Sequence, residues 1–181
     1  MKLSRSIAAL GLAAALALPG QAFADPELKI PNFSGLRQKA VESTDITIDG
    51  FLLRIARKFA RADGNDPDAA ATASFLEDIK SIRVRNFTFD EDGAYSRADV
   101  EGVRKQLSGP DWSPLAQVHS RESKEDVDVY ICMQGEKISG LAVIAAEPRE
   151  FTIVNIVGSI DLDKIGRLEG QFGIPKLSQN Q

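Results

Sequence analysis

Cysteine and histidine are almost absent from this chain, and their scarcity excludes several kinds of site. The one cysteine, Cys132, excludes an intramolecular disulfide framework. The one histidine, His119, excludes a multi-histidine metal centre and almost all histidine-based acid/base pairs. The formal charge is -4 at pH 7, whereas a nucleic-acid-binding surface normally needs a strong basic excess. The sequence therefore predicts no metal site, no cofactor and no nucleic-acid partner.

The named catalytic motifs are missing as well. The chain contains no G-x-S-x-G, no G-x-G-x-x-G after a strand, no phosphate loop, no H-E-x-x-H and no C-x-x-C. His119 lies beside Ser120 in an expected strand. Neighbouring residues of a strand point to opposite faces, so His119 cannot act as the base for a Ser120 nucleophile. We therefore predict no catalytic residue and no enzymatic activity, and we expect Cys132 to be a small core side chain.

A long hydrophobic run occurs only at the start of the chain, and its flanks have the pattern of a secretory signal peptide. Lys2 and Arg5 precede a twelve-residue apolar run from Ile7 to Leu18, and Ala22-Phe23-Ala24 provides the small-x-small cleavage site. The run is shorter than the roughly twenty apolar residues that cross a bilayer. We expect cleavage after Ala24 and one domain over residues 25–181.

The expected location of the protein after signal-peptide cleavage follows from the same features. No later segment is long and apolar enough to span a membrane. A lipid anchor would need a cysteine at the cleavage point, but Cys132 lies deep in the chain. The sequence therefore predicts a soluble, acidic protein of the periplasm, or a secreted one, without a lipid anchor.

Periodicity predicts helices first and strands afterwards. A short helix is expected from Ser34, a short strand or extended lead-in at 44–49, and helices at 50–62 and 67–78. A further helix should begin at Ser96, with Asp99 three residues on as in a capping box, and a last one at Asp161. Strands are expected at residues 80–90, 115–121, 127–134, 138–146 and 151–158.

These elements predict an α+β fold of one domain. Short connections at 135–137 and 147–149 make an antiparallel meander of the last three strands. We expect a mostly antiparallel sheet of about five strands in the order β-α-β-β-β-β-α, preceded by two or three helices, with helices covering a sheet face.

One expected strand has an irregular pattern, since its apolar residues occupy even positions up to Val84 and odd positions from Phe87. Either a bulge near Arg85-Asn86 resets the phase or the strand passes between two packing environments, and we favour the bulge. Arg83 and Arg85 could pair across the sheet with Asp126 and Asp128, which have the same spacing.

The most distinctive surface feature is a basic stripe on the helix expected at 50–62, formed by Arg54, Arg57, Lys58 and Arg61. Residues 25–61 hold seven basic and five acidic side chains, whereas residues 62–181 hold thirteen and 21. A solvated helix face is the default interpretation of such a stripe. The segregated charge also suits an anionic envelope surface or an acidic partner.

Several segments resemble a bacterial exported family known as domain of unknown function 4252. They are VRNFTFDEDGAYS at 84–96, GPDWSPL at 109–115, EDVDVYI at 125–131, ISGLAVIAAEPREFTIVNIVGSIDL at 138–162 and GQFGIP at 170–175, within a resemblance over about 36–175. The resemblance implies an exported bacterial protein with no assigned activity, cofactor or catalytic residue. Many relatives look like lipoproteins, and the missing cysteine departs from that pattern.

Three functions remain open. The leading hypothesis is a non-enzymatic, soluble periplasmic module that binds an envelope protein or surface. The alternative is a small-ligand carrier, with a pocket between sheet and helices where Arg85-Asn86 and the loop of Trp112 approach each other. A loop tryptophan folded over the core edge is the commoner arrangement. The third is a hydrolase that uses Asp126 and Asp128.

Overall fold

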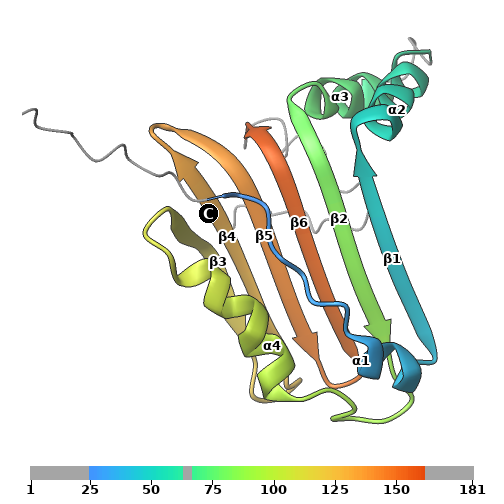
Figure 1. The fold of residues 1–181 in the computed structure, drawn as a ribbon, viewed down its shortest axis with the longest axis vertical. Coiled ribbons are helices and arrows are strands. Elements are labelled where there is room, and N and C mark those ends of the chain that lie inside the picture. The colour runs from blue at the N-terminus through green and yellow to red at the C-terminus, as the bar shows by residue number, and fades with distance from the viewer. Residues whose placement is uncertain (1–24, 63–66, 162–181) are drawn as a thin grey trace, which may run out of the picture.

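Every neighbouring pair of strands is antiparallel, and the chain builds an open sheet of six strands with order β1-β2-β6-β5-β4-β3 (Figure 1). The computed structural model describes residues 25–62 and 67–161. The helices are α1 (Ser34–Lys39), α2 (Gly50–Ala62), α3 (Pro67–Leu76) and α4 (Arg97–Arg104), followed by the 3-10 turn η1 (Lys105–Ser108). The strands are β1 (Glu42–Asp49), β2 (Ile79–Thr88), β3 (Trp112–His119), β4 (Asp126–Gln134), β5 (Lys137–Glu147) and β6 (Glu150–Ile160).

The α+β class and the meander of β4, β5 and β6 are confirmed. The expected count of about five strands is low by one, because residues 44–49 belong to the full strand β1, which pairs with residues 81–88 of β2. α4 begins as predicted, with a capping box between Ser96 and Asp99. The helix expected from Asp161 lies outside the described residues. No helix in the described ranges is long and apolar enough to cross a membrane.

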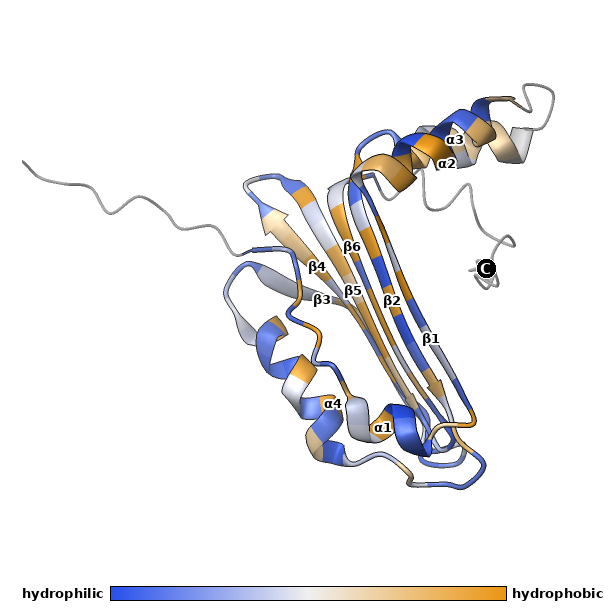
Figure 2. Cartoon of the chain, turned by 45° about the vertical axis from the view of Figure 1, so that its right-hand side comes forward, coloured by the Kyte–Doolittle hydropathy of each residue, from blue (hydrophilic) through white to orange (hydrophobic). Residues whose placement is uncertain are grey.

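The first face of the sheet holds the main core. α4, α1 and the segment before α1 lie over this face (Figures 1 and 2). The core side chains include Phe87, Val103, Ile144 and Phe151, each at most 1% exposed. Burying a side chain of this size contributes roughly 1.5–3 kcal/mol, so this layer supplies much of the driving force for folding.

The second face is covered differently. α2 and α3 pack together at the end of the sheet where β1 ends and β2 begins, on the side away from α4 (Figure 2). Leu53 of α2 and Leu76 of α3 join Ile79, Leu141 and Ile160 in a smaller core. This contact fixes α2 to the sheet through one side of the helix.

The irregular pattern of β2 is explained by these two faces. The expected bulge near Arg85-Asn86 is wrong, because β2 pairs with β1 and β6 without interruption there. Ile82 packs against the smaller core and Phe87 against the main core, so both phases of the pattern meet apolar neighbours. The register shift in β2 occurs at its start, between Ile79 and Ser81.

Candidate functional site

The four cations of the basic stripe have different surroundings in the structure. Arg54 and Lys58 are exposed, and no carboxylate among the described residues pairs with either. Arg61 is exposed but forms an ion pair with Glu77. Arg57 is half-buried, and its guanidinium donates a hydrogen bond of 3.4 Å to the backbone carbonyl of Ile79. Arg54 and Lys58 are therefore available for binding, whereas Arg57 helps to hold α2 on β2.

Large apolar side chains lie in the open beside these cations. Phe51 is 64% exposed, Leu52 49% and Phe59 73%. The guanidinium of Arg54 lies 5.8 Å from the centre of the Phe51 ring, within the range of a cation–π contact. We call Phe51, Leu52, Arg54, Lys58 and Phe59 the α2 surface. It joins exposed aromatic rings to unpaired positive charge on one helix.

Sequence reasoning found the cations but missed the apolar part of this surface. The apolar side chains of α2 extend around more than half of the helix, and the sequence pattern treats Leu52, Leu53, Ile55, Ala56, Phe59 and Ala60 as one apolar side. Only Leu53 is buried among them, because α2 meets the sheet along one narrow side. The width of the apolar arc was the signal that some of these residues lie outside the core.

A second group of polar side chains surrounds Arg104 of α4. Its Nε atom donates a 2.7 Å hydrogen bond to Oδ2 of Asp128, and Nη2 lies 2.7 Å from Oδ2 of Asp126 and 2.6 Å from Oδ2 of Asp128. Gln117 donates to the other oxygen of Asp128 at 3.0 Å, and His119 contacts Asp126. The expected pairing of Asp126 and Asp128 with Arg83 and Arg85 is wrong, since Arg104 takes both carboxylates.

The electrostatics of this Arg104 cluster are those of an ion-pair network. Burial raises the pKa of Asp126, but the hydrogen bond and charge of Arg104 and the contact with His119 outweigh it and lower the pKa. Burial lowers the pKa of Arg104, but Asp126, Glu101 and Asp128 outweigh it and raise the pKa. Asp126 therefore stays ionised at neutral pH, which suits an ion pair better than a proton donor.

The same cluster contains a triplet with donor types that can bind metals. His119, Asp126 and Asp128 each place one ligand atom within 4.8 Å of the others. The guanidinium of Arg104 already lies against both carboxylates and supplies the positive charge that a metal ion would bring. The geometry therefore gives no support to a metal site or to the hydrolase hypothesis.

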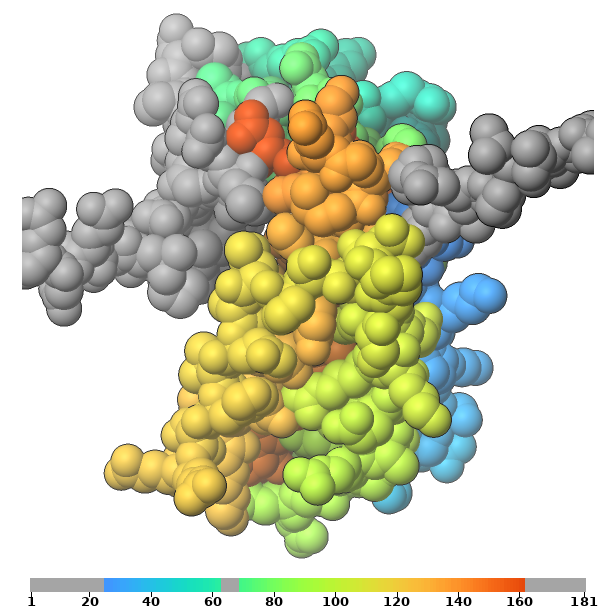
Figure 3. Space-filling model, turned by 90° about the vertical axis from the view of Figure 1, so that its left-hand side faces the viewer, coloured from blue at the N-terminus to red at the C-terminus, as the bar shows by residue number. Residues whose placement is uncertain are grey.

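Two open depressions occur on the described surface, both on the side of the sheet that carries α4. One has a volume of about 410 Å³ and lies between α4 and the β3–β4 side, with Tyr95, Arg104, Lys124 and Glu147 among its lining residues (Figure 3). Tyr95 stacks on Phe151 with ring centroids 5.2 Å apart, and its hydroxyl donates to the carbonyl of Glu147. Tyr95 therefore adds an aromatic side chain to a depression that is lined mainly by charged and small residues.

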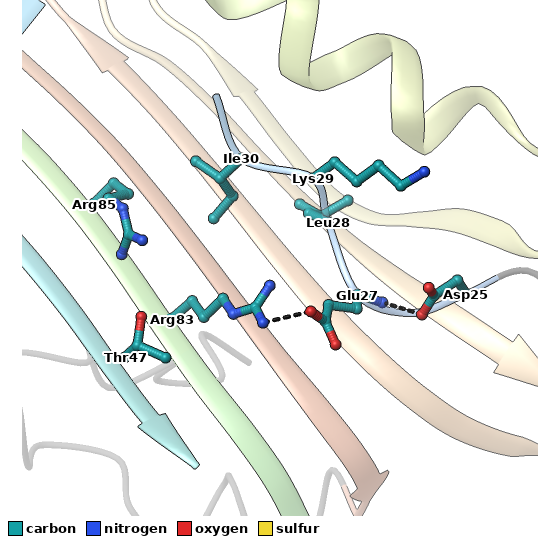
Figure 4. Close-up of a pocket in the computed structure, with 8 residues that line it drawn as sticks. All are labelled: Asp25, Glu27, Leu28, Lys29, Ile30, Thr47, Arg83 and Arg85. Carbon is teal, nitrogen blue, oxygen red and sulfur yellow. Dashed lines mark hydrogen bonds and ion pairs between the residues drawn. The ribbon is translucent and has the colours of Figure 1, made fainter. Parts of the chain in front are cut away.

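The other depression has a volume of about 350 Å³ and lies where the N-terminal segment crosses the sheet (Figure 4). Arg83 points toward Glu27 of that segment and pairs with it, while Arg85 pairs with Asp45 of β1 at 2.6 Å. Trp112 is not among its lining residues. The expected meeting of Arg85-Asn86 with the Trp112 loop is therefore absent from this depression.

Trp112 and Cys132 both belong to the main core. Trp112 is 7% exposed at the start of β3, as expected for a tryptophan folded over a core edge, and it pairs in register with Cys132. Cys132 is fully buried, and burial raises the pKa of its thiol. The prediction that Cys132 is a small core side chain is confirmed.

Comparison with known proteins adds one assignment. The family model described as Domain of unknown function (DUF4252) matches residues 37–168. The chain belongs to this family. The match spans every strand of the sheet and the helices α2, α3 and α4, so the matched part of this chain includes both the α2 surface and the Arg104 cluster. No curated protein and no solved structure matches the chain.

Proposed function

We propose that this DUF4252 protein is a non-enzymatic, soluble module of the periplasm that binds an envelope component through its α2 surface. The observation that supports this most is the exposure of Phe51, Leu52 and Phe59 beside the unpaired cations Arg54 and Lys58. Exposed aromatic side chains next to arginine are enriched at binding surfaces, because they lose little conformational entropy on contact. The N-terminal signal pattern supports the proposed location.

The carrier alternative has weaker support. A carrier encloses most of its ligand in a pocket lined mainly by apolar side chains. The two depressions described above are open, and charged side chains that form ion pairs border them. A small anionic or polar ligand would have to displace these pairs.

Site-specific photo-crosslinking in intact cells tests the proposal. A photoreactive phenylalanine analogue replaces Phe59 in one variant and Val118 in the control, because Val118 is also apolar and 55% exposed but lies on the edge strand β3. We expect adducts with envelope components from position 59 and none from position 118. The adducts from position 59 should disappear in the Arg54→Glu, Lys58→Glu background.

Arg57 is deliberately left unchanged in this background, because reversing a half-buried side chain that bonds to Ile79 would disturb the packing of α2. Equal adduct formation at both positions, or adducts that survive the charge reversal, would contradict the proposed binding surface.

A further inference from the structure

We infer that the component bound by the α2 surface is an anionic phospholipid bilayer, into which Phe51, Leu52 and Phe59 insert. This inference rests on the proposed function and names its partner class. Amphipathic helices that lie in the membrane interface combine a strongly apolar side carrying Phe and Leu with Lys and Arg on the polar side. The described structure of α2 has this combination on its exposed surface.

The arrangement of side chains around α2 supports insertion. Leu52 and Phe59 are seven residues apart, so two helical turns bring them to the same side. Phe51 lies about 100° away around the helix, on the side of Lys58, so it flanks this pair. Lys58 and Arg54 lie on the flank of this apolar ridge, four residues apart, and both are exposed. Their long apolar stems let the charged ends reach the phosphate level while the rings lie deeper.

The opposite side of α2 is fixed, so this orientation does not depend on binding. Leu53 is 1% exposed in the smaller core, and Arg57 bonds to the start of β2. Arg61 holds the end of the helix against Glu77. A helix anchored in this way presents its apolar ridge before it meets a membrane, which avoids the cost of folding on contact.

The position of α2 in the molecule also suits a flat partner. α2 and α3 lie at one end of the sheet, away from α1 and α4 (Figures 1 and 2). A flat surface can therefore reach α2 without meeting α1 or α4. The exposed ridge is convex, and a lipid surface accepts a convex ridge, whereas a protein partner needs a matching groove.

Charge distinguishes a bilayer from a second copy of this chain. A two-fold contact between two α2 surfaces would bring Arg54 and Lys58 near the same cations of the other copy, and such like-charge contacts are unfavourable. An anionic lipid surface attracts them instead. Residues 62–181 carry 21 acidic against thirteen basic side chains, so the remainder of the molecule is repelled and α2 faces the lipid.

Sedimentation with vesicles tests the inference on the purified protein. The probes are vesicles of phosphatidylethanolamine and phosphatidylcholine, with and without phosphatidylglycerol. We expect binding only when phosphatidylglycerol is present, and weaker binding as salt rises. Since each cation near such a surface changes partitioning about fivefold, Arg54→Ala with Lys58→Ala should weaken binding about 25-fold. Phe59→Ser should weaken it about tenfold or more.

Matched controls separate the α2 surface from general charge and apolarity. Lys105→Ala with Arg121→Ala removes two exposed cations outside α2, and Val118→Ser removes an exposed apolar side chain on β3. Neither change should alter vesicle binding by more than about twofold, against the fivefold expected of one cation at the surface. A Phe59→Trp variant should show a blue-shifted emission with phosphatidylglycerol vesicles, because the indole enters a less polar environment.

The outcomes distinguish this inference from the proposed function. Absence of vesicle binding, together with protein adducts from position 59 in cells, overturns the lipid inference and leaves the proposed function standing. Absence of both overturns the two together. Equal binding to vesicles without phosphatidylglycerol, or equal losses in the control variants, also overturns the assignment of an anionic bilayer to the α2 surface.

Discussion

Arg104 of α4 pairs with a carboxylate that is buried inside the domain. Its guanidinium joins α4 to β4 by contacting Asp126 and Asp128, and the side chain of Asp128 is only 2% exposed. A buried carboxylate without a partner is costly, whereas a buried pair gains little over apolar residues of the same size. Arg104 is therefore important because its removal would leave the buried carboxylate of Asp128 without its charged partner.

Replacing Arg104 by Met should lower the free energy of unfolding by about 3 kcal/mol, because it leaves Asp128 buried with only Gln117 as a donor. Glu101→Gln is the matched control, since Glu101 contacts the same guanidinium from an exposed position and should contribute under about 0.5 kcal/mol. Urea unfolding measures both changes. Equal, small losses in the two variants would show that Asp128 tolerates burial without Arg104.

Tyr95 makes the stability of the domain depend on pH in the alkaline range. Burial raises the pKa of its hydroxyl to about 12, with smaller contributions from the charges of Glu147 and Asp126, whereas the pKa of an unfolded tyrosine is about 10. The neutral phenol is therefore favoured by folding. Its contribution to stability is complete below about pH 10 and is lost as the pH rises toward about 12.

The Tyr95→Phe variant should lose about 1 kcal/mol at pH 7, because the carbonyl of Glu147 loses its donor. It should also lose less stability than the original protein between pH 10 and pH 12. Chemical unfolding across this range measures the effect, and Tyr130→Phe serves as the control with the same change of side chain. Parallel pH profiles for all three proteins would exclude Tyr95 as the responsible group.

At the scale of elements, the start of β2 depends on a close approach to β6. Gly158 has a φ of 150°, and a Cβ atom there would lie 2.4 Å from the carbonyl oxygen of Asp78 and 2.7 Å from Cα of Ile79. The register of β2 shifts between Ile79 and Ser81, beside this glycine. The same carbonyl accepts a 3.1 Å hydrogen bond from the backbone of Ser159. Glycine is therefore required for the two strands to meet.

Gly158→Ala should destabilise the domain by about 2 kcal/mol or more, because backbone atoms cannot yield to the new Cβ. Gly102→Ala in α4 is the matched control, since nothing lies within 4 Å of its Cβ position and alanine favours a helix by up to about 1 kcal/mol. Thermal or urea unfolding should therefore give changes of opposite sign. If Gly158→Ala left the stability unchanged, the backbone at the register shift between Ile79 and Ser81 would accommodate the new Cβ at low cost.

Local patterns predicted most elements of the fold, and they failed where an element has two apolar sides. The Ser96 and Asp99 pair predicted the start of α4, because a capping box is a contact between near neighbours. In β2 and α2, the spacing of the apolar residues along the sequence could not show which of them contact the main core, the smaller core or solvent. The bulge at Arg85-Asn86 was wrong for this reason, and the exposure of Phe59 was not foreseen.

At the scale of the whole molecule, the N-terminal segment is held across the centre of the sheet. Asn155 of β6 is fully buried, and its amide accepts from the backbone of Leu28 at 3.0 Å and donates to the carbonyls of Pro26 and Leu141 at 3.0 and 3.3 Å. A Cβ at Gly140 would lie 2.7 Å from that of Pro26, so the segment passes close above β5. No local pattern predicts a contact across 127 residues of sequence.

Asn155→Leu keeps the branching and the number of side-chain heavy atoms but leaves the polar groups of Leu28 and Pro26 without these partners, so we expect a loss of about 2–3 kcal/mol. The destabilisation should appear first in residues 25–30, because Leu28 is the one buried residue among them. Hydrogen exchange should therefore accelerate at the Leu28 amide well before the amides of β5.

Gln106→Leu, which removes the hydrogen bonds from η1 to the backbone of Lys29, is the control and should accelerate exchange only at the more exposed edge of the segment. If the Leu28 amide and the β5 amides accelerated together in Asn155→Leu, the segment would be part of the cooperative core, because its release would then require global unfolding.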